Sequence, residues 1–311
     1  MRSLTIHGQA IPAGEVTELN LPVAMLPTHT QILLPLFVYR GTADGPVLLL
    51  TAGLHGDEVN GTETIRRMMR TDRLVPEAGT VIAMPIVNVY GFLHQSRDLP
   101  DGKDLNRSFP GSKRGSLARQ LAHLLLNEVV VHVDCGIDLH TGGSSRSNFP
   151  QVRCDFTRRE SLDLARAFGA PLLLHSREIA GSFRKAGGNL GKNIIVFEGG
   201  EANRIDEVAI KEGISGIERV MAHLGMIPER VAPQASQELE ESQWLRASFG
   251  GMFVPVVPYG AEVKAGQVLA TLGDPYGEVV REIKAPSAGF IIGLNNHPVV
   301  HAGDAVIHFG G

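Results

Sequence analysis

Apolar residues along the chain gather in short unbroken runs. Pro46–Thr51 and Thr80–Val87 are runs of this kind. Continuous apolar runs are typical of strands that are buried on both faces of a sheet. Strands of this type are predicted at 46–51, 80–87, 131–140, 171–174 and 193–197.

Between these runs, apolar residues recur at helical spacing, as Leu117, Leu121 and Leu125 do. Residues 1–45 instead mix short apolar runs with Pro and Gly, which predicts strands leading into the main sheet. The alternation of buried strands and amphipathic helices predicts an α/β fold, with a mixed, mostly parallel sheet flanked by helices. The predicted helices lie at 58–70, 116–130, 160–168 and 203–224.

The pattern changes after Leu224. Residues 225–241 are rich in Pro, Glu and Gln and have the composition of a linker. Beyond them, short runs of Val, Ile and Phe are separated by turns that contain Gly or Pro. This spacing is typical of a small all-β sandwich or barrel. We therefore expect two domains, residues 1–229 and residues 230–311.

The composition indicates a folded protein without a nucleic-acid or membrane partner. Of 311 residues, 43% are hydrophobic and 20% charged, and the formal net charge is −4. That charge gives no reason to expect an anionic partner. No apolar run approaches the roughly 20 residues of a membrane helix, and the N-terminus lacks the apolar segment of a secretory signal. Because Cys135 and Cys154 fit no disulfide framework, we expect a cytoplasmic protein with two buried thiols. A homo-oligomer is compatible with this composition.

Functional side chains first gather in Leu48–Gly61. An apolar run ends at Gly53, and His55 and Glu58 follow at the point where a helix should begin. α/β proteins place their sites at such junctions of strand and helix. Residues three apart on a helical turn are neighbours, and imidazole and carboxylate are both zinc ligands. The stretch therefore predicts two of the three ligands that a catalytic zinc takes from its protein.

Two further side chains follow other predicted strands. His140, in Asp138–Gly143, would be the third ligand and would complete a His₂Glu zinc site with one open position. Zinc lowers the pKa of bound water towards about 7 and polarises a carbonyl group. Glu198, in Val196–Gly200, would take the proton of the water and pass it to the leaving amine. The set predicts hydrolysis of an amide.

The polar segment 88–116 is rich in Asn, Gly, Asp, Arg and Pro and shows little periodicity. A loop this long inside a domain is usually functional or disordered. Arg97 could stabilise an oxyanion, and Asp104 could hydrogen-bond a ligand imidazole and fix its tautomer. Arg107, with Asn106, could hold a substrate carboxylate as a planar fork.

These motifs together are similar to those of a known family. The order H-x-x-E, then R…D-x-N-R, then H, then E resembles the zinc carboxypeptidase-like superfamily. Gly53–Glu58, Asp104–Gly111 and Asp138–His140 look more closely like the succinylglutamate desuccinylase/aspartoacylase family, over about residues 45–225. The resemblance implies the zinc carboxypeptidase-like fold with a C-terminal β-domain.

The resemblance also implies functions for single residues. One Zn²⁺ per chain would be bound by His55, Glu58 and His140, and Glu198 would be the general base. The substrate would be bound, or its carbonyl polarised, by the residues of the polar segment that match the family: Arg97, Asn106 and Arg107.

The implied reaction is deacylation of a small N-acyl amino acid or a related amide. A bacterial branch of the family includes deacetylases of acylated diamino acids, so the resemblance does not fix the acyl group or the amino acid. Arg153 and Arg184 are further candidates for contacting a charged group of the substrate.

The C-terminal part has its own resemblance. Ala261–Ala270 and Ile283–Ile291 look like a lipoyl/biotinyl-type β-fold. Carrier domains of that type present a lysine at a hairpin tip, whereas the predicted tip here, Asp274–Gly277, has none. We therefore expect a lid, an oligomer contact or a wall of the site entrance rather than a carrier.

Two alternatives to the deacylase remain open. One is a metallocarboxypeptidase acting on short peptides, although a β-domain near the mouth of the site would restrict long substrates. The other is a non-catalytic binding protein that retains the metal site, although the complete set of ligands, base and arginines argues against decay. Imidazole and carboxylate also suit other first-row metal ions.

Overall fold

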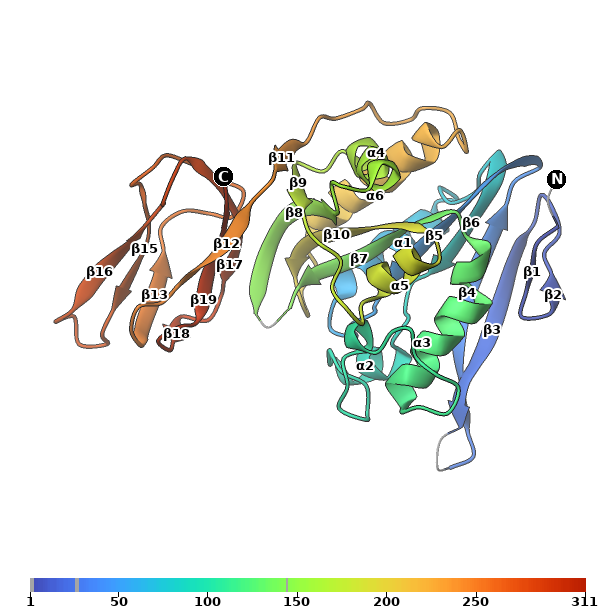
Figure 1. Ribbon diagram of the computed structural model, residues 1–311, viewed down its shortest axis with the longest axis horizontal. Coiled ribbons are helices and arrows are strands. Elements are labelled where there is room, and N and C mark those ends of the chain that lie inside the picture. The colour runs from blue at the N-terminus through green and yellow to red at the C-terminus, as the bar shows by residue number, and fades with distance from the viewer. Residues whose placement is uncertain (1–2, 26–27, 144) are drawn as a thin grey trace.

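Parallel strands form the centre of the main sheet in the computed structural model, which describes residues 3–25, 28–143 and 145–311. Strands were predicted within residues 1–45, and residues 1–2 and 26–27 of that range lie outside the described residues. The central order is β6-β5-β7-β10, and all three pairings are parallel (Figure 1). These strands are β5 (Ala43–Ala52), β6 (Ala78–Met84), β7 (Cys135–Gly142) and β10 (Asn193–Glu201).

Antiparallel strands extend the sheet on both sides, which confirms the predicted mixed sheet. On one side β4 (Gln31–Arg40) pairs with β6, and β3 (Val16–Met25) pairs with β4. On the other side β8 (Arg146–Cys154) pairs with β10 in antiparallel orientation, and β9 (Leu172–His175) then pairs with the far edge of β8 in parallel orientation. The remaining N-terminal strands form a separate hairpin, β1 (Thr5–Ile6) and β2 (Gln9–Ala10).

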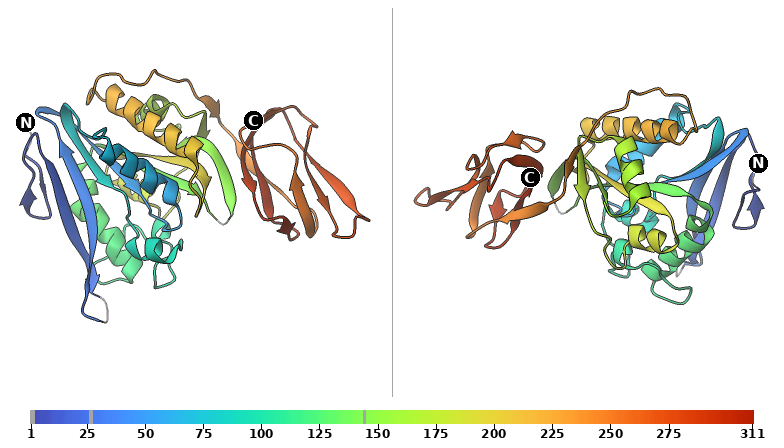
Figure 2. Two further views of the ribbon diagram at one scale, coloured as in Figure 1. Left: turned by 180° about the vertical axis from the view of Figure 1, so that it is seen from behind. Right: turned by 45° about the horizontal axis from the view of Figure 1, so that its top comes forward.

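Helices cover both faces of the sheet (Figure 2). Leu48 and Leu50 of β5 belong to the core under one set of helices, and Leu49 belongs to the core under the other. This alternation explains why β5 is apolar at four successive positions, Val47–Leu50. One set is α1 (Val59–Arg70), α4 (Arg159–Phe168) and α6 (Glu207–His223), and the other includes α3 (Leu117–Glu128) and α5 (Phe183–Asn189).

Three local predictions need correction, and one helix was missed. The predicted helix 203–224 begins only at Glu207, because the Asp206 carboxylate accepts from the backbone N–H groups of Val208 and Ala209 and caps the helix there. The predicted strand 131–140 begins only at Cys135, since a 3₁₀ turn, η2 (Val130–His132), precedes it. Helix α5 was not predicted. The segment 88–116, which was predicted as a loop, is partly helical. Within 88–116 lie α2 (Val89–His94) and the 3₁₀ helix η1 (Leu105–Arg107).

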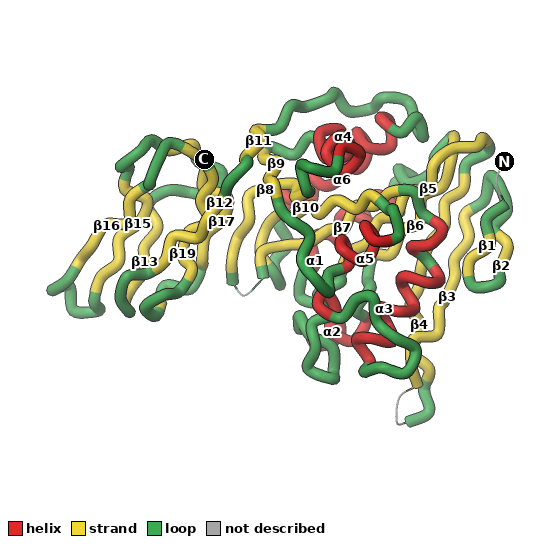
Figure 3. The backbone as a smooth tube through the Cα atoms, viewed as in Figure 1, coloured by secondary structure: helices red, strands yellow, loops and turns green. Residues whose placement is uncertain are grey.

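The C-terminal part consists of strands, as predicted, and lies at one end of the molecule (Figure 3). Phe253, Leu269 and Ile307 belong to its own hydrophobic core. Its strands are β12 (Ser242–Arg246), β13 (Gly251–Pro255), β14 (Glu262–Val263), β15 (Val268–Gly273), β16 (Val280–Lys284), β17 (Gly289–Asn295), β18 (Val299–Val300) and β19 (Ala305–Gly310). Four of them form a second sheet in the order β16-β15-β13-β18. The predicted hairpin tip lies between β15 and β16.

The main sheet continues without a break into the C-terminal part. Strand β17 pairs with β8 in antiparallel register, so that Gly293 lies opposite Asn148. Gly293 allows this close approach, because a Cβ there would lie 2.8 Å from the backbone carbonyl oxygen of Ser147. Upstream, β11 (Gln237–Leu239), within the predicted linker, pairs with β9. The division into domains at residue 229/230 stays a prediction, and hydrogen bonds of one sheet cross it.

Two other predictions concern the burial of the two cysteines and the lack of a membrane-spanning helix. Cys135 and Cys154 are both buried and free, and burial raises the pKa of each thiol to about 12. Among the described residues, no helix is both long and apolar enough to cross a membrane.

A buried histidine links β19 to β12. The ring of His308 stacks on Trp244 with 4.8 Å between centroids and 11° between planes, and its Nε2 lies 3.1 Å from Oγ of Ser242. Its Nδ1 is buried and has no hydrogen-bond partner in the described parts of the chain. Burial, with the nearby charge of Arg153, lowers the pKa of His308 to about 3. The fold therefore requires a neutral imidazole here.

This requirement predicts how stability depends on pH. As pH falls below about 6.5, the unfolded chain protonates His308 while the folded chain does so only near pH 3, so the unfolded state binds more protons. The free energy of unfolding should fall by up to about 1.4 kcal/mol per pH unit within this window from this group alone. In urea titrations of the metal-free protein, His308→Gln should show a shallower loss between pH 6.5 and 4 than the wild type. The exposed His301, replaced by Gln, is the control, and equal slopes in all three proteins would contradict the prediction.

Candidate active site

A tight turn between β5 and α1 holds the first two predicted ligands. Gly53 adopts a φ of +59°, and the backbone N–H of Glu58 donates to the carbonyl of His55 at 3.2 Å. Glu58 is the N-cap residue of α1, so both ligands lie in the turn before the helix rather than on its first turn. Gly56 packs on α2, where a Cβ would lie 1.8 Å from the carbonyl carbon of Gly91. Only glycine allows this turn to pack so closely.

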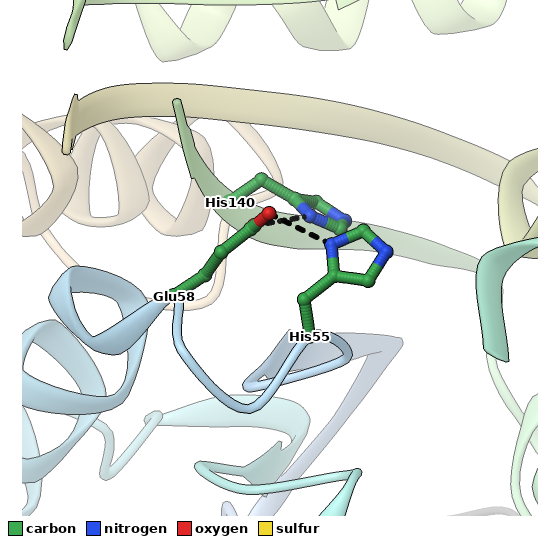
Figure 4. Close-up of side chains that lie close together, drawn as sticks. All are labelled: His55, Glu58 and His140. Atoms are coloured by element: carbon green, nitrogen blue, oxygen red, sulfur yellow. Dashed lines mark hydrogen bonds and ion pairs between the residues drawn. The ribbon is translucent and has the colours of Figure 1, made fainter. Parts of the chain in front are cut away.

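The three predicted ligands converge on one point (Figure 4). One carboxylate oxygen of Glu58 lies 2.8 Å from Nδ1 of His55, and the other lies 2.8 Å from Nδ1 of His140. The three ligand atoms lie within 4.8 Å of one another, and all three residues are buried. Two imidazole nitrogens and a carboxylate oxygen, directed at one point, fit the donor set of a catalytic zinc.

The outer nitrogen of each imidazole meets a carboxylate. Nε2 of His55 lies 3.1 Å from Oδ1 of Asp104, the contact that the sequence predicted. Nε2 of His140 lies 2.8 Å from Oδ2 of Asp138, which the sequence analysis did not assign. Alternate strand residues share a face, so the pair Asp138 and His140 was a usable signal. These contacts orient both rings with Nδ1 towards the centre, as in metal sites whose histidines are held by carboxylates.

The charges of the cluster stabilise one another. Burial opposes ionisation of Glu58, but His55 and His140 outweigh it and hold the pKa of Glu58 well below its usual value. Burial likewise opposes a charged His140, but Asp138 and Glu58 raise its pKa well above the ordinary value. The backbone N–H of Thr141 also donates to Glu58 at 3.1 Å. The Glu58 carboxylate and the two imidazoles therefore stabilise each other's charged forms.

Arg97 lies beside this cluster and is only partly exposed. It donates to Oδ2 of Asp104 at 2.9 Å and to Oε1 of Glu58 at 3.2 Å. Asp104 therefore contacts both His55 and Arg97, and it joins the polar segment to the turn that holds the ligands.

Asn106 and Arg107 belong to η1 at the rim of the pocket. Oδ1 of Asn106 accepts from the backbone N–H of Phe183 at 2.9 Å, which anchors η1 to α5. Nη1 of Arg107 donates to the carbonyl of Asn106, and the rest of this exposed guanidinium faces the pocket and solvent.

Glu198 on β10 lies opposite His140 in the parallel register. Nδ2 of Asn148 donates to its Oε2 at 2.8 Å, and Nη1 of Arg153 lies 3.4 Å from its Oε1. Both partners come from β8, and Asn148 was not identified from the sequence.

All eight residues assigned from the sequence gather here, and seven of them line one cavity of about 320 Å³. The eighth, Asp104, does not line the cavity and contacts Nε2 of His55. Arg153 and Arg184 also line the cavity, together with Arg146 and Trp244, which the sequence analysis missed. The polar residues of β8 follow no strict alternation, so periodicity gave no signal for Arg146, and Trp244 reaches the cavity only through the tertiary fold.

Comparison with known proteins agrees with this geometry. A profile of the succinylglutamate desuccinylase/aspartoacylase catalytic domain matches residues 44–224. The chain belongs to the succinylglutamate desuccinylase/aspartoacylase family. The matched range contains the three ligand residues and Glu198, and it ends before Trp244.

Members of the family resemble the chain over nearly its whole length. The N-alpha-acetyl-L-2,4-diaminobutyric acid deacetylase of Halomonas elongata is 28% identical over 292 residues, which are 88% of this chain and 84% of the relative. The product-bound structure of the ectoine utilization protein EutE (DoeB) from Ruegeria pomeroyi has a TM-score of 0.84 at 25% identity, covering 96% of this chain and 97% of that chain. A succinylglutamate desuccinylase/aspartoacylase from Rhodobacter sphaeroides has a TM-score of 0.83 at 27% identity, covering 95% and 94%.

The contact between Asp138 and His140 predicts an effect on metal affinity. Asp138→Asn keeps the shape of the side chain but removes its charge, so the affinity for zinc should fall about 10- to 100-fold. Competition against a chromogenic chelator measures this affinity. Asp98→Asn, an exposed residue of the polar segment, is the control and should bind zinc as the wild type does. Unchanged affinity in Asp138→Asn would contradict the assignment.

Proposed function

We propose that the chain is a zinc-dependent amidohydrolase that removes the acyl group from a small N-acyl amino acid or a related linear amide. The observation that carries the proposal is the meeting of three ligand atoms within 4.8 Å in the same cavity as Glu198 and five arginines. A relative that is 28% identical in sequence is a deacetylase of an acylated diamino acid, which supports amide deacylation as the reaction class.

The donor set formed by His55, Glu58 and His140 fits zinc, because both imidazoles present Nδ1 and are held from behind by carboxylates. A bound zinc ion would supply a water of lowered pKa and polarise the amide carbonyl.

Glu198 is the proposed general base. Asn148 and Arg153 hold its carboxylate from two sides, so it stays oriented towards the cavity. It would take a proton from water and return it to the leaving nitrogen. Arg97 provides a fixed positive charge next to Glu58, where it could stabilise the negative charge that develops on the carbonyl oxygen.

Arg107 and Arg184 are the proposed contacts for the carboxylate of the amino acid. Arg107 has no ion pair among the described residues, and Asn106 fixes the backbone next to it. Arg184 is buried, and its Nη2 donates to the carbonyls of Ser176 and Arg177. Its Nη1 is buried without a partner among the residues that the structure describes. A planar fork with a free edge suits a carboxylate group.

The size of the cavity supports a small substrate. About 320 Å³ lies at the lower end of the volumes of ligand sites. This favours an N-acyl amino acid over the peptides of a carboxypeptidase. The Glu198 carboxylate, held by Asn148 and Arg153, and the arginines of the cavity favour an enzyme over a non-catalytic binding protein.

A substrate panel tests the reaction class. The zinc-loaded protein should hydrolyse at least one of the N-acetyl, N-formyl or N-succinyl amino acids and should leave unmodified dipeptides and tripeptides intact, as followed by release of the free amine. Metal analysis should find about one zinc per chain. Cleavage of peptides alone would favour the carboxypeptidase, and no turnover of any amide with zinc bound would favour the binding protein.

Glu198→Gln tests the base. The variant should bind zinc normally, but its turnover should fall about 10²- to 10⁴-fold because the amide cannot accept the proton. The matched control is Glu201→Gln on the same strand, since Glu201 pairs with Arg204 outside the cavity lining. Near-normal turnover in Glu198→Gln would remove this residue from the mechanism.

A further inference from the structure

A row of residues that lie opposite one another runs from the C-terminal strands to the proposed base. Strands β12, β19, β17 and β8 follow one another across the main sheet (Figure 1). Trp244 lies opposite His308, which lies opposite Gly293. Gly293 in turn lies opposite Asn148, and residues paired in this way share one face of the sheet. Asn148 is the member of the row that contacts Glu198.

Gly293 leaves room for the side chain of Asn148. A Cβ at position 293 would lie 2.7 Å from Oδ1 of Asn148 and 2.8 Å from the carbonyl oxygen of Ser147. The first of these atoms is the end of a side chain and could move, but the movement would take the amide from its present position. Asn148 is thus enclosed between β17 on one side and the Glu198 carboxylate on the other.

Asn148 donates the one hydrogen bond that the Glu198 side chain accepts from the described residues, from Nδ2 to Oε2 at 2.8 Å. The asparagine is buried, and both residues line the catalytic cavity. Only this orientation of the amide suits the contact, because the turned amide would bring its oxygen against a carboxylate oxygen. The contact therefore fixes Oε2 and leaves Oε1 for the transfer of a proton.

Arg153 approaches the other oxygen less closely. Its Nη1 lies 3.4 Å from Oε1 of Glu198, beyond the range of about 2.7–3.2 Å of an N–H···O hydrogen bond. Its Nε is buried and has no partner in the part of the chain that the structure describes. This guanidinium has donors to spare and could close on both carboxylate oxygens as a fork. A cation bound to both oxygens would oppose the uptake of a proton by the base.

We propose that Asn148 is a positioning residue for the Glu198 carboxylate, which it keeps from closing into a fork with Arg153. The inference rests on the proposed function and deepens it, because it gives the two partners of the base different parts. Arg153 supplies a nearby positive charge, whereas Asn148 sets the plane of the carboxylate.

The first experiment removes the donor. Asn148→Leu keeps a side chain of similar size, and kcat should fall about 10- to 100-fold, since a small displacement of a reacting group has a cost of this order. The substrate is the best one among the N-acetyl, N-formyl and N-succinyl amino acids of the panel. KM and the affinity for zinc should stay near their wild-type values.

The chain offers a matched control for this variant. Asn193 lies on the same strand as Glu198, accepts hydrogen bonds from Ser161 and Arg158, and does not line the catalytic cavity. Asn193→Leu should keep the kcat of the wild type. An unchanged kcat in Asn148→Leu, or a change confined to KM, would overturn the proposal.

A double variant tests whether Asn148 acts through the base. Asn148→Leu should cause no further loss of kcat in the Glu198→Gln background, because the group that it positions is already absent. Losses that multiply in the double variant would show that Asn148 acts on the reaction by another route.

A second double variant tests the fork. Arg153→Lys keeps the charge, but an ammonium group cannot form the planar fork of a guanidinium. In the Asn148→Leu background this change should therefore recover part of the lost kcat, with Arg153→Lys alone as the reference. No recovery would show that closure of Arg153 on the carboxylate is not the cause of the loss.

A spectroscopic measurement separates this inference from the proposed function. In the full-length protein with isotope-labelled asparagine, a side-chain amide proton of Asn148 should lie downfield, because its acceptor is charged. Its absence in Asn148→Leu assigns the signal. The signal should move upfield in Glu198→Ala and stay in Glu201→Ala.

The two proposals can then fail independently. If this signal responds to Glu198→Ala but no amide is hydrolysed, the deacylase proposal fails and the contact that positions Glu198 stands. If amides are hydrolysed and the signal does not respond, the positioning by Asn148 fails alone.

Discussion

The carboxylate of Glu58 is the constraint on which the site depends. A buried charge is costly unless it is paired and hydrogen-bonded, and this one is surrounded by two imidazoles, a backbone N–H and Arg97. Those partners come from the turn after β5, from β7 and from the polar segment. They can meet only if β5 and β7 are adjacent, parallel and end at the same edge of the sheet, as the pairing of Thr51 with Asp138 ensures. The same pairing of β5 with β7 that builds the sheet therefore also brings the partners of Glu58 together.

The sequence could single out the residues that meet in the cluster because their signal is local. His55 and Glu58 follow an apolar run that must be a buried strand, and the run is apolar throughout because Leu48 and Leu49 belong to different cores. Asn148 and Trp244 gave no such signal. Their place beside the cavity depends on pairings such as Gly293 with Asn148, which join residues far apart in the sequence. Periodicity cannot report such pairings.

The errors in the fold have equally specific causes. Helix α5 was missed because Gly187 and Gly188 weaken a helical pattern, and both are tightly packed, Gly187 against Ile194 and Gly188 against Arg158 and Glu178. Helix α6 starts late because a capping side chain, not the apolar period, decides the first residue. Apolar spacing reports which face is buried, and it says little about where the ends of an element lie.

The shared edge of β8 has a consequence for the order in which the protein becomes complete. Strand β17 begins at Gly289 and occupies the part of the β8 edge that carries Arg146 and Asn148. During synthesis from the N-terminus, all three proposed metal ligands and Glu198 are present long before that partner emerges. Until then, half of the β8 edge has unpaired backbone groups, which invite association with other chains. Strand β17 therefore completes the β8 wall of a cavity whose other functional residues are synthesised earlier. The same pairing removes the unpaired backbone groups of the β8 edge from contact with other chains.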